Sequence, residues 1–186
     1  MGRPKVTLPF GSEPMGARVA RILAAAVDPL FVVAAAGQEL PELPAEVVVL
    51  RDRREDRGPL EGLAVGLRAI GPRAGAAYAT GCDVPLLKPE FVRRMVELSA
   101  GHAVAVPHVA GFDQPLAAVY NTSVLPRVEA LLAADRLRPA MLFDLVDTRR
   151  VSADELVDVD PHLQSLANVN SPASYREALA AAGLQG

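Results

Sequence analysis

Short apolar runs alternate along the chain with stretches of helical periodicity. The apolar runs are rich in Val and Ala and are bounded by Pro, Gly or Asp, which is typical of buried strands. They occupy residues 29–36, 45–52, 75–85, 102–109 and 114–121. Between them, apolar residues recur every three or four positions, which predicts helices over residues 14–26, 60–70, 88–99, 123–134, 139–146 and 173–182.

This alternation predicts the fold class. Strands and helices that alternate at this spacing indicate an α/β protein with a mostly parallel sheet and helices on both of its faces. The chain has 186 residues, of which 51% are hydrophobic, so we expect one domain over residues 1–186 with a substantial core. Aromatic residues make up only 4% and Trp is absent, so Ala, Val and Leu do most of the packing.

Charge and cysteine content exclude several classes of protein. The net charge is −3, with Lys and Arg spread along the chain, which argues against nucleic acid or an anionic membrane as the main partner. Cys82 is the only cysteine, so an intrachain disulfide and a cysteine zinc site are excluded and a reducing, cytoplasmic location is favoured. We expect neither a signal peptide nor a membrane span, because the apolar runs are too short.

In a sheet of this kind, ligands bind beyond the carboxyl ends of the strands, so the polar residues that follow the apolar runs are candidates. Asp83 follows one such run in "GCDVPLL". A carboxylate at this position can hold Mg2+, which keeps several waters and needs only one or two protein carboxylates. An Asp that begins a turn before Pro85 is an equal alternative. We expect Cys82 beside it to be a packed side chain rather than a nucleophile.

A second candidate region is "LRDRREDRGPLEGL". Asp52 ends an apolar run, and Gly58 and Pro59 lead into the next helix. Backbone N–H groups at a helix start favour anions and polar ligands, so we expect these three residues to be functional. The charged residues 53–56 between them fit a solvated surface loop.

The third candidate region is "LANVNSPASYREAL". Asn168 and Asn170 are two positions apart on an extended segment, so both side chains point the same way. Ser171 and Pro172 then begin the last helix, with Ser171 as its N-cap. Alternatively, the two amide side chains only hydrogen-bond to the backbone at this junction. That role does not explain why both side chains point to the same side of the segment.

Together these pieces resemble one family, the molybdenum cofactor guanylyltransferases, which are nucleotidyltransferases with a three-layer Rossmann-like fold. The resemblance covers nearly the whole chain and rests on "GRPK", "LPFG", "RD....RGPLEGL..GL", "GCDVPLLKPEFV..M", "DQPLAAVYN" and "NVNSP", in that order. The Cys-Asp-x-Pro piece recurs across many nucleotidyltransferases. The "QPLAAVY" piece and the "NVNSP" ending are more specific to this family.

The resemblance implies a reaction in which GMP passes from GTP to molybdopterin, giving molybdopterin guanine dinucleotide and pyrophosphate. It implies Lys5 and Asp83 as catalytic residues, Lys5 on the triphosphate and Asp83 on Mg2+. The implied nucleotide-binding residues are Gly2, Lys5, Asp52, Gly58, Pro59 and Asp83, and those on the pterin side are Gln114, Asn168 and Asn170. The implied partners are GTP, molybdopterin, and molybdoenzymes or other proteins of cofactor biosynthesis.

This chemistry needs no general base, because the attacking phosphate of molybdopterin is already ionised at neutral pH. Positioning, Mg2+, Lys and backbone N–H groups can supply most of the catalysis. His102, His108 and His162 form no acid–base constellation, so we expect structural or surface roles. Arg136 and Arg138 lie where the family carries basic residues, and both a phosphate contact and a solvated helix junction remain open for them.

The chain departs from the family pattern in two places. In the family, an apolar strand and a Gly-rich loop precede the residues that match "MGRPK". We therefore expect the first strand and most of the phosphate loop to be missing, through a misplaced start or a clipped chain, and two neighbouring strands to lack a partner. Members with guanine specificity carry an Asn near residues 32–40, where this chain has three Ala and a Gly. A cytidylyltransferase acting on the same pterin, and an inactive binding protein, remain alternatives.

Overall fold

The structure is a computed structural model that describes residues 4–52, 54 and 57–184. Its α-helices are α1 (Met15–Ala24), α2 (Gly58–Ile70), α3 (Pro89–Leu98), α4 (Leu125–Ala133) and α5 (Pro172–Ala181). Its strands are β1 (Pro9–Phe10), β2 (Glu13–Pro14), β3 (Phe31–Ala34), β4 (Val48–Arg51), β5 (Ala76–Thr80), β6 (Val104–Val109), β7 (Phe112–Asp113), β8 (Ala117–Asn121) and β9 (Thr148–Ser152). The 3-10 helices are η1 (Lys5–Thr7), η2 (Thr122–Val124), η3 (Pro139–Leu142), η4 (Ala153–Glu155) and η5 (Gln164–Leu166).

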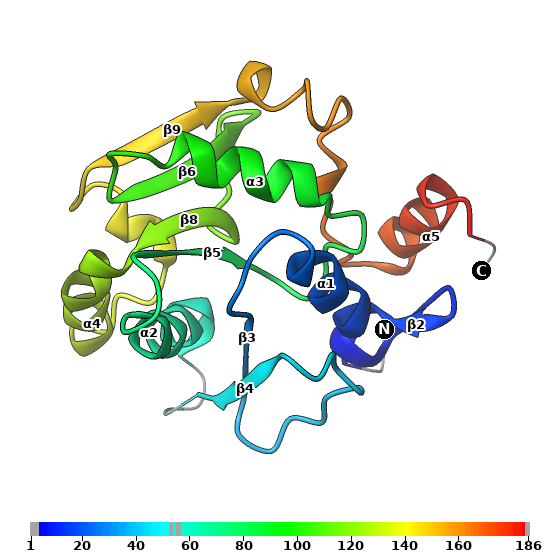
Figure 1. Cartoon of the computed structure of the whole chain (residues 1–186), viewed down its shortest axis with the longest axis horizontal. Helices are drawn as coiled ribbons and strands as arrows, with labels where there is room; N and C mark the ends of the chain where they lie inside the picture. Colours follow the sequence, from blue (N-terminus) through cyan, green and yellow to red (C-terminus); the bar gives the residue numbers. More distant parts are fainter. Residues whose placement is uncertain (1–3, 53, 55–56, 185–186) are drawn as a thin grey trace.

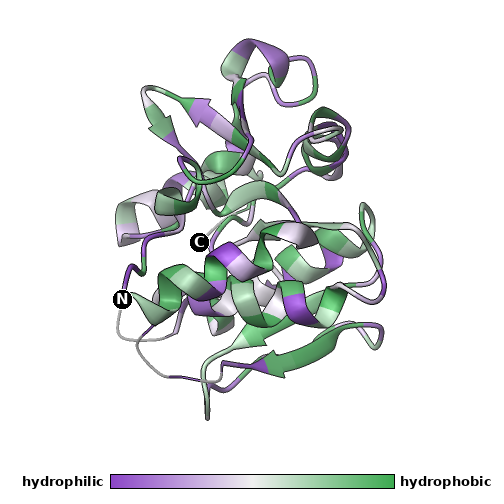
Figure 2. Ribbon diagram, turned by 90° about the vertical axis from the view of Figure 1, so that its left-hand side faces the viewer, coloured by the Kyte–Doolittle hydropathy of each residue, from purple (hydrophilic) through white to green (hydrophobic). Residues whose placement is uncertain are grey.

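Helices cover both faces of the larger sheet, which confirms the three-layer α/β class (Figure 1). Val104 and Val106 of β6 pack with α2 and α4, whereas Ala105 between them packs with α1 and α3. This alternation follows from the two-residue period of a strand. The helix ribbons in Figure 2 alternate between hydrophobic and hydrophilic residues, as expected of helices that bury one side against a sheet.

The expectation of a mostly parallel sheet is wrong for the larger sheet, whose order is β5-β8-β6, with β9 on the other side of β6. β5, β6 and β9 run in one direction, but β8 lies reversed between β5 and β6, so both of its pairings are antiparallel. The reason is the short connection from β6 to β8, which contains only the small strand β7. A parallel return needs a crossover of about a dozen residues or more.

β3 and β4 form a separate parallel pair, in register from Phe31 opposite Val48 to Ala34 opposite Arg51. Figure 1 shows this pair set apart from the larger sheet. Among the described residues, β3 pairs only with β4 and β5 pairs only with β8, and no strand lies between β3 and β5.

Most of the elements expected from the pattern are present, with one exception. The prediction of a helix over residues 139–146 is wrong, because this segment forms only the 3-10 turn η3. Leu142 at the end of η3 and Phe143 after it anchor the segment in the core. β9 was not expected, because Arg149 and Arg150 hide its pattern and only Val151 is buried. Backbone pairing with β6 makes it a strand, and charged residues are usual on such an edge.

Within the described part of the chain, no helix is both long and apolar enough to cross a bilayer.

The segment after β9 is anchored to the start of α3 by a buried carboxylate. The Asp160 side chain is fully buried and forms an ion pair of 2.8 Å with Lys88 Nζ. Its Oδ2 accepts a hydrogen bond of 2.7 Å from the Ser165 N–H, and the Lys88 N–H donates to Ser165 Oγ at 3.1 Å. These contacts fix the chain just before Val169. Val169 packs with Phe10 in a small core that joins the N-terminal segment to α5.

We expect Asp160→Asn to lower the free energy of unfolding by about 1–3 kcal/mol at pH 7, because it breaks this pair and leaves Lys88 unpaired. Burial raises the pKa of Asp160, but the hydrogen bonds from Lys88 and Ser165 outweigh burial and hold it below the ordinary value. Since the folded pKa is the lower one, the stabilisation is present above pH of about 3.9 and is lost as the pH falls further.

Urea unfolding of wild type and Asp160→Asn at pH 7 and pH 3 measures this effect. The exposed Asp158, paired with Arg94, gives the matched control Asp158→Asn, which should change stability by less than about 0.5 kcal/mol. An equal loss of stability at both pH values in Asp160→Asn would contradict the account.

Candidate active site

Three segments far apart in the sequence meet at one end of β5. Lys5 Nζ lies 2.9 Å from Asp83 Oδ2 and also donates a hydrogen bond to Asn170 Oδ1. The Val169 N–H donates to the Asp83 backbone oxygen at 2.8 Å. An ammonium, a carboxylate and an amide are thus held together at the carboxyl end of a strand, where α/β folds bind ligands.

Lys5 is positioned by the packing of η1 directly on α1. A Cβ atom at Gly16 would lie 2.4 Å from Val6 Cγ2 and 3.0 Å from the Val6 carbonyl oxygen, so only glycine allows this approach. Val6 is buried, and the Met15 N–H donates to the Leu8 oxygen at 2.8 Å. The role of Gly16 was missed, although a glycine inside a helical pattern is a signal of close packing.

Asp83 is positioned by a second glycine. A Cβ atom at Gly81 would lie 2.5 Å from Asp83 Oδ1, so the carboxylate can fold back only because residue 81 has no side chain. The Asp83 side chain is 20% exposed, which leaves its oxygens within reach of a ligand. Gly81 is the first residue of the "GCDVPLL" motif. Its role could not be predicted, because the sequence alone does not reveal which way the Asp83 carboxylate points.

The donor set at this site fits a hard divalent cation that needs few protein ligands. Among the described residues, no three His, Cys, Asp or Glu side chains gather as metal ligands. A cation held at Asp83 would have one protein carboxylate as a ligand, and water and ligand oxygens would complete its shell. Mg2+ suits such a site, since it usually keeps several waters and is shared with substrate phosphates.

Asp52 directly follows β4, and its N–H donates to the Ala34 oxygen at 2.9 Å. Its side chain faces the first turns of α2, where a Cβ atom at Gly62 would lie 3.8 Å from Asp52 Oδ1. Its Oδ1 is buried and accepts no hydrogen bond from the described residues. Burial, and then the charge of Glu61, raise the pKa of Asp52 above its ordinary value. An unsatisfied carboxylate oxygen at a helix start can accept a hydrogen bond from a ligand hydroxyl or amino group. Glu61, itself buried, was not singled out from the sequence.

Gly58 and Pro59 are the first two residues of α2. Gly58 has φ +63°, a left-handed conformation that favours glycine, and both residues are exposed at the helix start. Pro59 lines a groove that also reaches Gly81 and Cys82, so the start of α2 and the end of β5 border the same cavity.

Gln114 and Asn168 lie at the same edge of the sheet. Gln114 is in the turn before β8, whose first residue Ala117 pairs with Thr80 at the end of β5. Asn168 and Asn170 are exposed on either side of the buried Val169, in keeping with two amides that share one side. Among the described residues, neither Gln114 nor Asn168 has a side-chain hydrogen bond to Lys5, Asp83 or Asn170.

Gly2 lies outside the described residues. Arg136 and Arg138 are exposed between α4 and η3, and within the described residues neither forms an ion pair with the Lys5–Asp83 site. Cys82 lines the groove, and burial raises the pKa of its thiol, which favours the unreactive form.

The three histidines lie apart from the Lys5–Asp83 pair. His102 Nδ1 contacts Asp147 Oδ2 at 3.0 Å, at the opposite end of the strands. His108 Nδ1 contacts Asp113 Oδ1 at 2.6 Å, and this carboxylate also accepts from Arg150 Nε. His162 is exposed.

We expect Gly81→Ala to displace the Asp83 carboxylate and to weaken binding of Mg2+ with nucleotide by at least about tenfold, because the added methyl group occupies the position of Oδ1. Isothermal titration with Mg2+ and GTP measures the loss, and circular dichroism checks the fold. Gly75, just before β5, is the matched control, since a Cβ there meets no atom within 4 Å. Equal affinities of Gly81→Ala and Gly75→Ala would refute the positioning role.

Solved structures with similar folds include nucleotidyltransferases. The molybdopterin-guanine dinucleotide biosynthesis protein A from Archaeoglobus fulgidus superposes with a TM-score of 0.80 at 18% identity, covering 98% of this chain and 92% of that chain. A 2-C-methyl-D-erythritol 4-phosphate cytidylyltransferase from Thermus thermophilus has a TM-score of 0.71 at 17% identity, covering 97% and 94%. These similarities confirm the Rossmann-like nucleotidyltransferase fold.

Sequence comparisons give closer relatives. A protein from Mycobacterium avium, named a probable molybdenum cofactor guanylyltransferase, is 38% identical over 181 residues, which cover 95% of this chain and 87% of the relative. A protein of the same name from Mycobacterium ulcerans is 40% identical and covers 93% and 84%. The family model described as a MobA-like NTP transferase domain matches residues 1–148. The chain therefore belongs to the MobA-like NTP transferase family and is a nucleotidyltransferase.

Proposed function

We propose that this protein transfers GMP from GTP to molybdopterin, giving molybdopterin guanine dinucleotide and pyrophosphate. The observation that carries nucleotidyl transfer is the contact of Lys5, Asp83 and Asn170 at the carboxyl end of β5. Guanine and the pterin are supported by the mycobacterial relatives, which are named as probable molybdenum cofactor guanylyltransferases. GTP as substrate also supports a cytoplasmic location, with molybdoenzymes or other proteins of cofactor biosynthesis as recipients.

In this proposal the two substrates bind at two neighbouring parts of the site. The unsatisfied Asp52 oxygen and the exposed helix start at Gly58 and Pro59 receive the nucleoside half. The exposed amides of Asn168 and Asn170 and the turn at Gln114 receive the pterin half. Lys5 contacts both Asp83 and Asn170. In this proposal the Lys5–Asp83 pair therefore lies between the nucleoside half and the pterin half of the site, where the phosphates of the two substrates meet.

Asp83 would hold Mg2+ together with the phosphate oxygens, and Lys5 would donate hydrogen bonds to the same phosphates. When bound, the metal ion neutralises charge that builds on the leaving pyrophosphate. A phosphate oxygen of molybdopterin forms a bond to the α-phosphorus of GTP while the bond from that phosphorus to the bridging oxygen breaks. Because the attacking phosphate is already ionised, no side chain has to remove a proton. Lys5 offsets the repulsion between the two anions.

Turnover with different nucleotides tests the proposal. Purified protein with Mg2+ and molybdopterin should release pyrophosphate with GTP at least about tenfold faster than with CTP or ATP, and chromatography should show the guanine dinucleotide. Faster turnover of CTP would identify a cytidylyltransferase instead. Binding of GTP without turnover of any nucleotide would favour an inactive binding protein.

Single substitutions test the assigned roles. Asp83→Asn should lower kcat by at least about a hundredfold, since it removes the metal-binding charge. Asn170→Ala should raise the KM for molybdopterin several-fold and leave GTP affinity unchanged. Asp158→Asn, on the exposed surface, is the control with full activity. If Asn170→Ala weakens GTP affinity instead, Asn170 belongs to the nucleotide half.

A further inference from the structure

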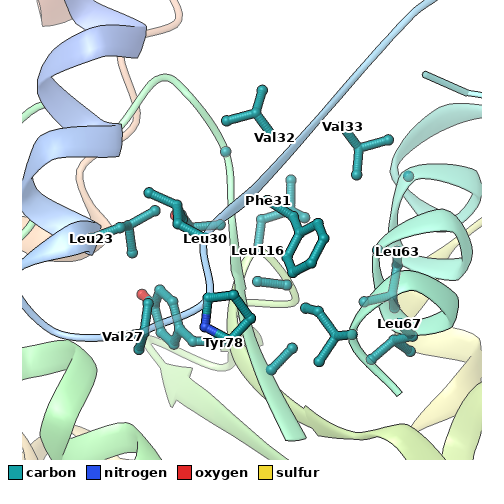
Figure 3. Close-up of a pocket in the computed structure, with 18 of the residues that line it drawn as sticks. Leu23, Val27, Leu30, Phe31, Val32, Val33, Leu63, Leu67, Tyr78 and Leu116 are labelled. Carbon is teal, nitrogen blue, oxygen red and sulfur yellow. The ribbon is translucent and has the colours of Figure 1, made fainter. Parts of the chain in front are cut away.

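An apolar groove with a volume of about 610 Å3 lies between β3 and β5. Figure 3 shows its walls, which include Phe31 from β3, Leu63 from α2 and Tyr78 from β5. The groove also reaches Gly81 in the candidate active site, and the amide side chain of Gln38 lines it just beyond the end of β3. In a mostly apolar cavity, a few polar side chains usually orient the ligand, so Gln38 is a candidate for this role.

Gln38 closes a tight turn that directly follows β3. The Gln38 N–H donates to the Ala35 oxygen at 3.1 Å, and the Ala35 N–H donates to Gln38 Oε1 at 3.1 Å. The backbone and the side chain of Gln38 therefore both bind the first residue of the turn.

These contacts decide which way the Gln38 amide is oriented. A backbone N–H can only donate, so the side-chain atom that faces Ala35 is the oxygen. The amide nitrogen Nε2 keeps two N–H groups, for which no acceptor is present among the described residues. At the border of the groove, Gln38 thus offers hydrogen-bond donors and no free acceptor on this atom.

Arg51, the last residue of β4, holds the same turn from the neighbouring strand. Its Nη1 donates to the Ala35 oxygen at 3.1 Å and to the Gln38 oxygen at 2.8 Å. The turn is therefore fixed before any ligand arrives, and a fixed donor loses little conformational freedom when it binds.

An acceptor without a partner lies on the other side of β3, toward α2. Asp52 follows Arg51, and its buried Oδ1 accepts no hydrogen bond from the described residues. A Cβ atom at Gly62 would lie 3.8 Å from this oxygen, and Gly62 lines the groove. The groove is therefore bordered by a fixed donor at the turn after β3 and has an unsatisfied carboxylate oxygen beside its α2 wall.

A donor and a carboxylate together fit the edge of guanine. Guanine presents the acceptor O6 next to two donors, the N1–H and the 2-amino group, whereas adenine and cytosine present an amino group where guanine has O6. The Nε2 atom of Gln38 cannot accept a hydrogen bond from an amino group. Two donors would then face each other in an apolar groove, which should weaken binding by at least about tenfold.

We propose that Gln38 selects guanine, with its Nε2 donating to O6 while Asp52 accepts from the N1–H and the 2-amino group. Arg51 is the positioning residue, because it holds the turn that orients the Gln38 amide. The inference rests on the proposed function for the nucleotide as ligand, and it adds the residue that reads the base.

Gln38→Glu tests the proposal, because it keeps an oxygen for the Ala35 N–H and replaces the two donors with an acceptor. Isothermal titration with Mg2+ and GTP, ATP or CTP measures base preference. Wild type should bind GTP at least about tenfold more tightly than ATP or CTP. The variant should lose at least about tenfold in GTP affinity and gain affinity for ATP and CTP. An unchanged ratio of GTP to CTP affinity would overturn the proposal, and so would equal affinities in wild type.

Two further variants separate the donor role from charge and from folding. Glu39→Gln changes the charge by one at the exposed neighbouring position and should keep the preference for GTP. Gln38→Met removes the donors without adding charge, so it should lose GTP affinity and gain none for ATP or CTP. Wild-type preference in Gln38→Met would refute the donor role, also if Gln38→Glu fails to fold.

Inosine triphosphate locates the contact on the base, because it keeps O6 and lacks the 2-amino group. Gln38→Glu should weaken its binding as strongly as that of GTP. A clearly smaller loss for inosine triphosphate would place Gln38 at the amino group and contradict the contact with O6.

The positioning role of Arg51 has its own test. Arg51→Met should lower the preference for GTP several-fold, and Arg51→Lys should restore part of it, since an ammonium can still donate to the two turn carbonyls. Full preference in Arg51→Met would refute the role.

Binding is measured rather than turnover, so this inference and the proposed reaction can fail separately. A protein that selects GTP through Gln38 but transfers GMP to no acceptor would contradict the reaction and support the role of Gln38. Transfer from GTP with undiminished selectivity in Gln38→Glu would support the reaction and overturn the role of Gln38.

Discussion

The ion pair between Lys5 and Asp83 is the contact on which the candidate site depends. It joins the N-terminal turn η1 to the end of β5, and Asn170 binds the same ammonium from the C-terminal segment. A partly exposed pair of this kind contributes little to stability. Its importance lies in position, because it holds a cation and a carboxylate together at the edge of the sheet where phosphates and a metal ion can share them.

Several less conspicuous contacts keep this pair in place. Gly16 lets η1 lie on α1, and Gly81 lets the Asp83 carboxylate fold back. The hydrogen bond from Val169 to the Asp83 oxygen sets the position of the two Asn residues, and the buried Asp160 anchors the chain that leads to them. The candidate site is therefore built by packing between segments that lie far apart in the sequence. Gly16 and Gly81 contribute because they have no side chain to block these contacts.

The hydrophobic pattern predicted most helices and strands, because the helices bury one face and the strands are apolar. It failed where tertiary contacts decide, as in β9, whose two Arg residues form a strand only because β6 offers a free edge. The apolar pattern does not reveal strand direction. The connection from β6 to β8 does, because it is too short for a parallel crossover. In the candidate site, residue type and position pointed to Asp83 and Asn170, and the family resemblance pointed to Lys5. Gly81 and Glu61 contribute through geometry that no local pattern encodes.

The central claim is that Lys5 and Asp83 act as one unit in binding the nucleotide with its metal ion. A double-mutant cycle of Lys5→Met and Asp83→Asn, measured as the affinity for GTP in the presence of Mg2+, tests it most directly. If the two residues are coupled, the double variant should lose little more affinity than the single variant that binds GTP less tightly. Losses that add in full would contradict the account, because they would show that the two side chains act independently.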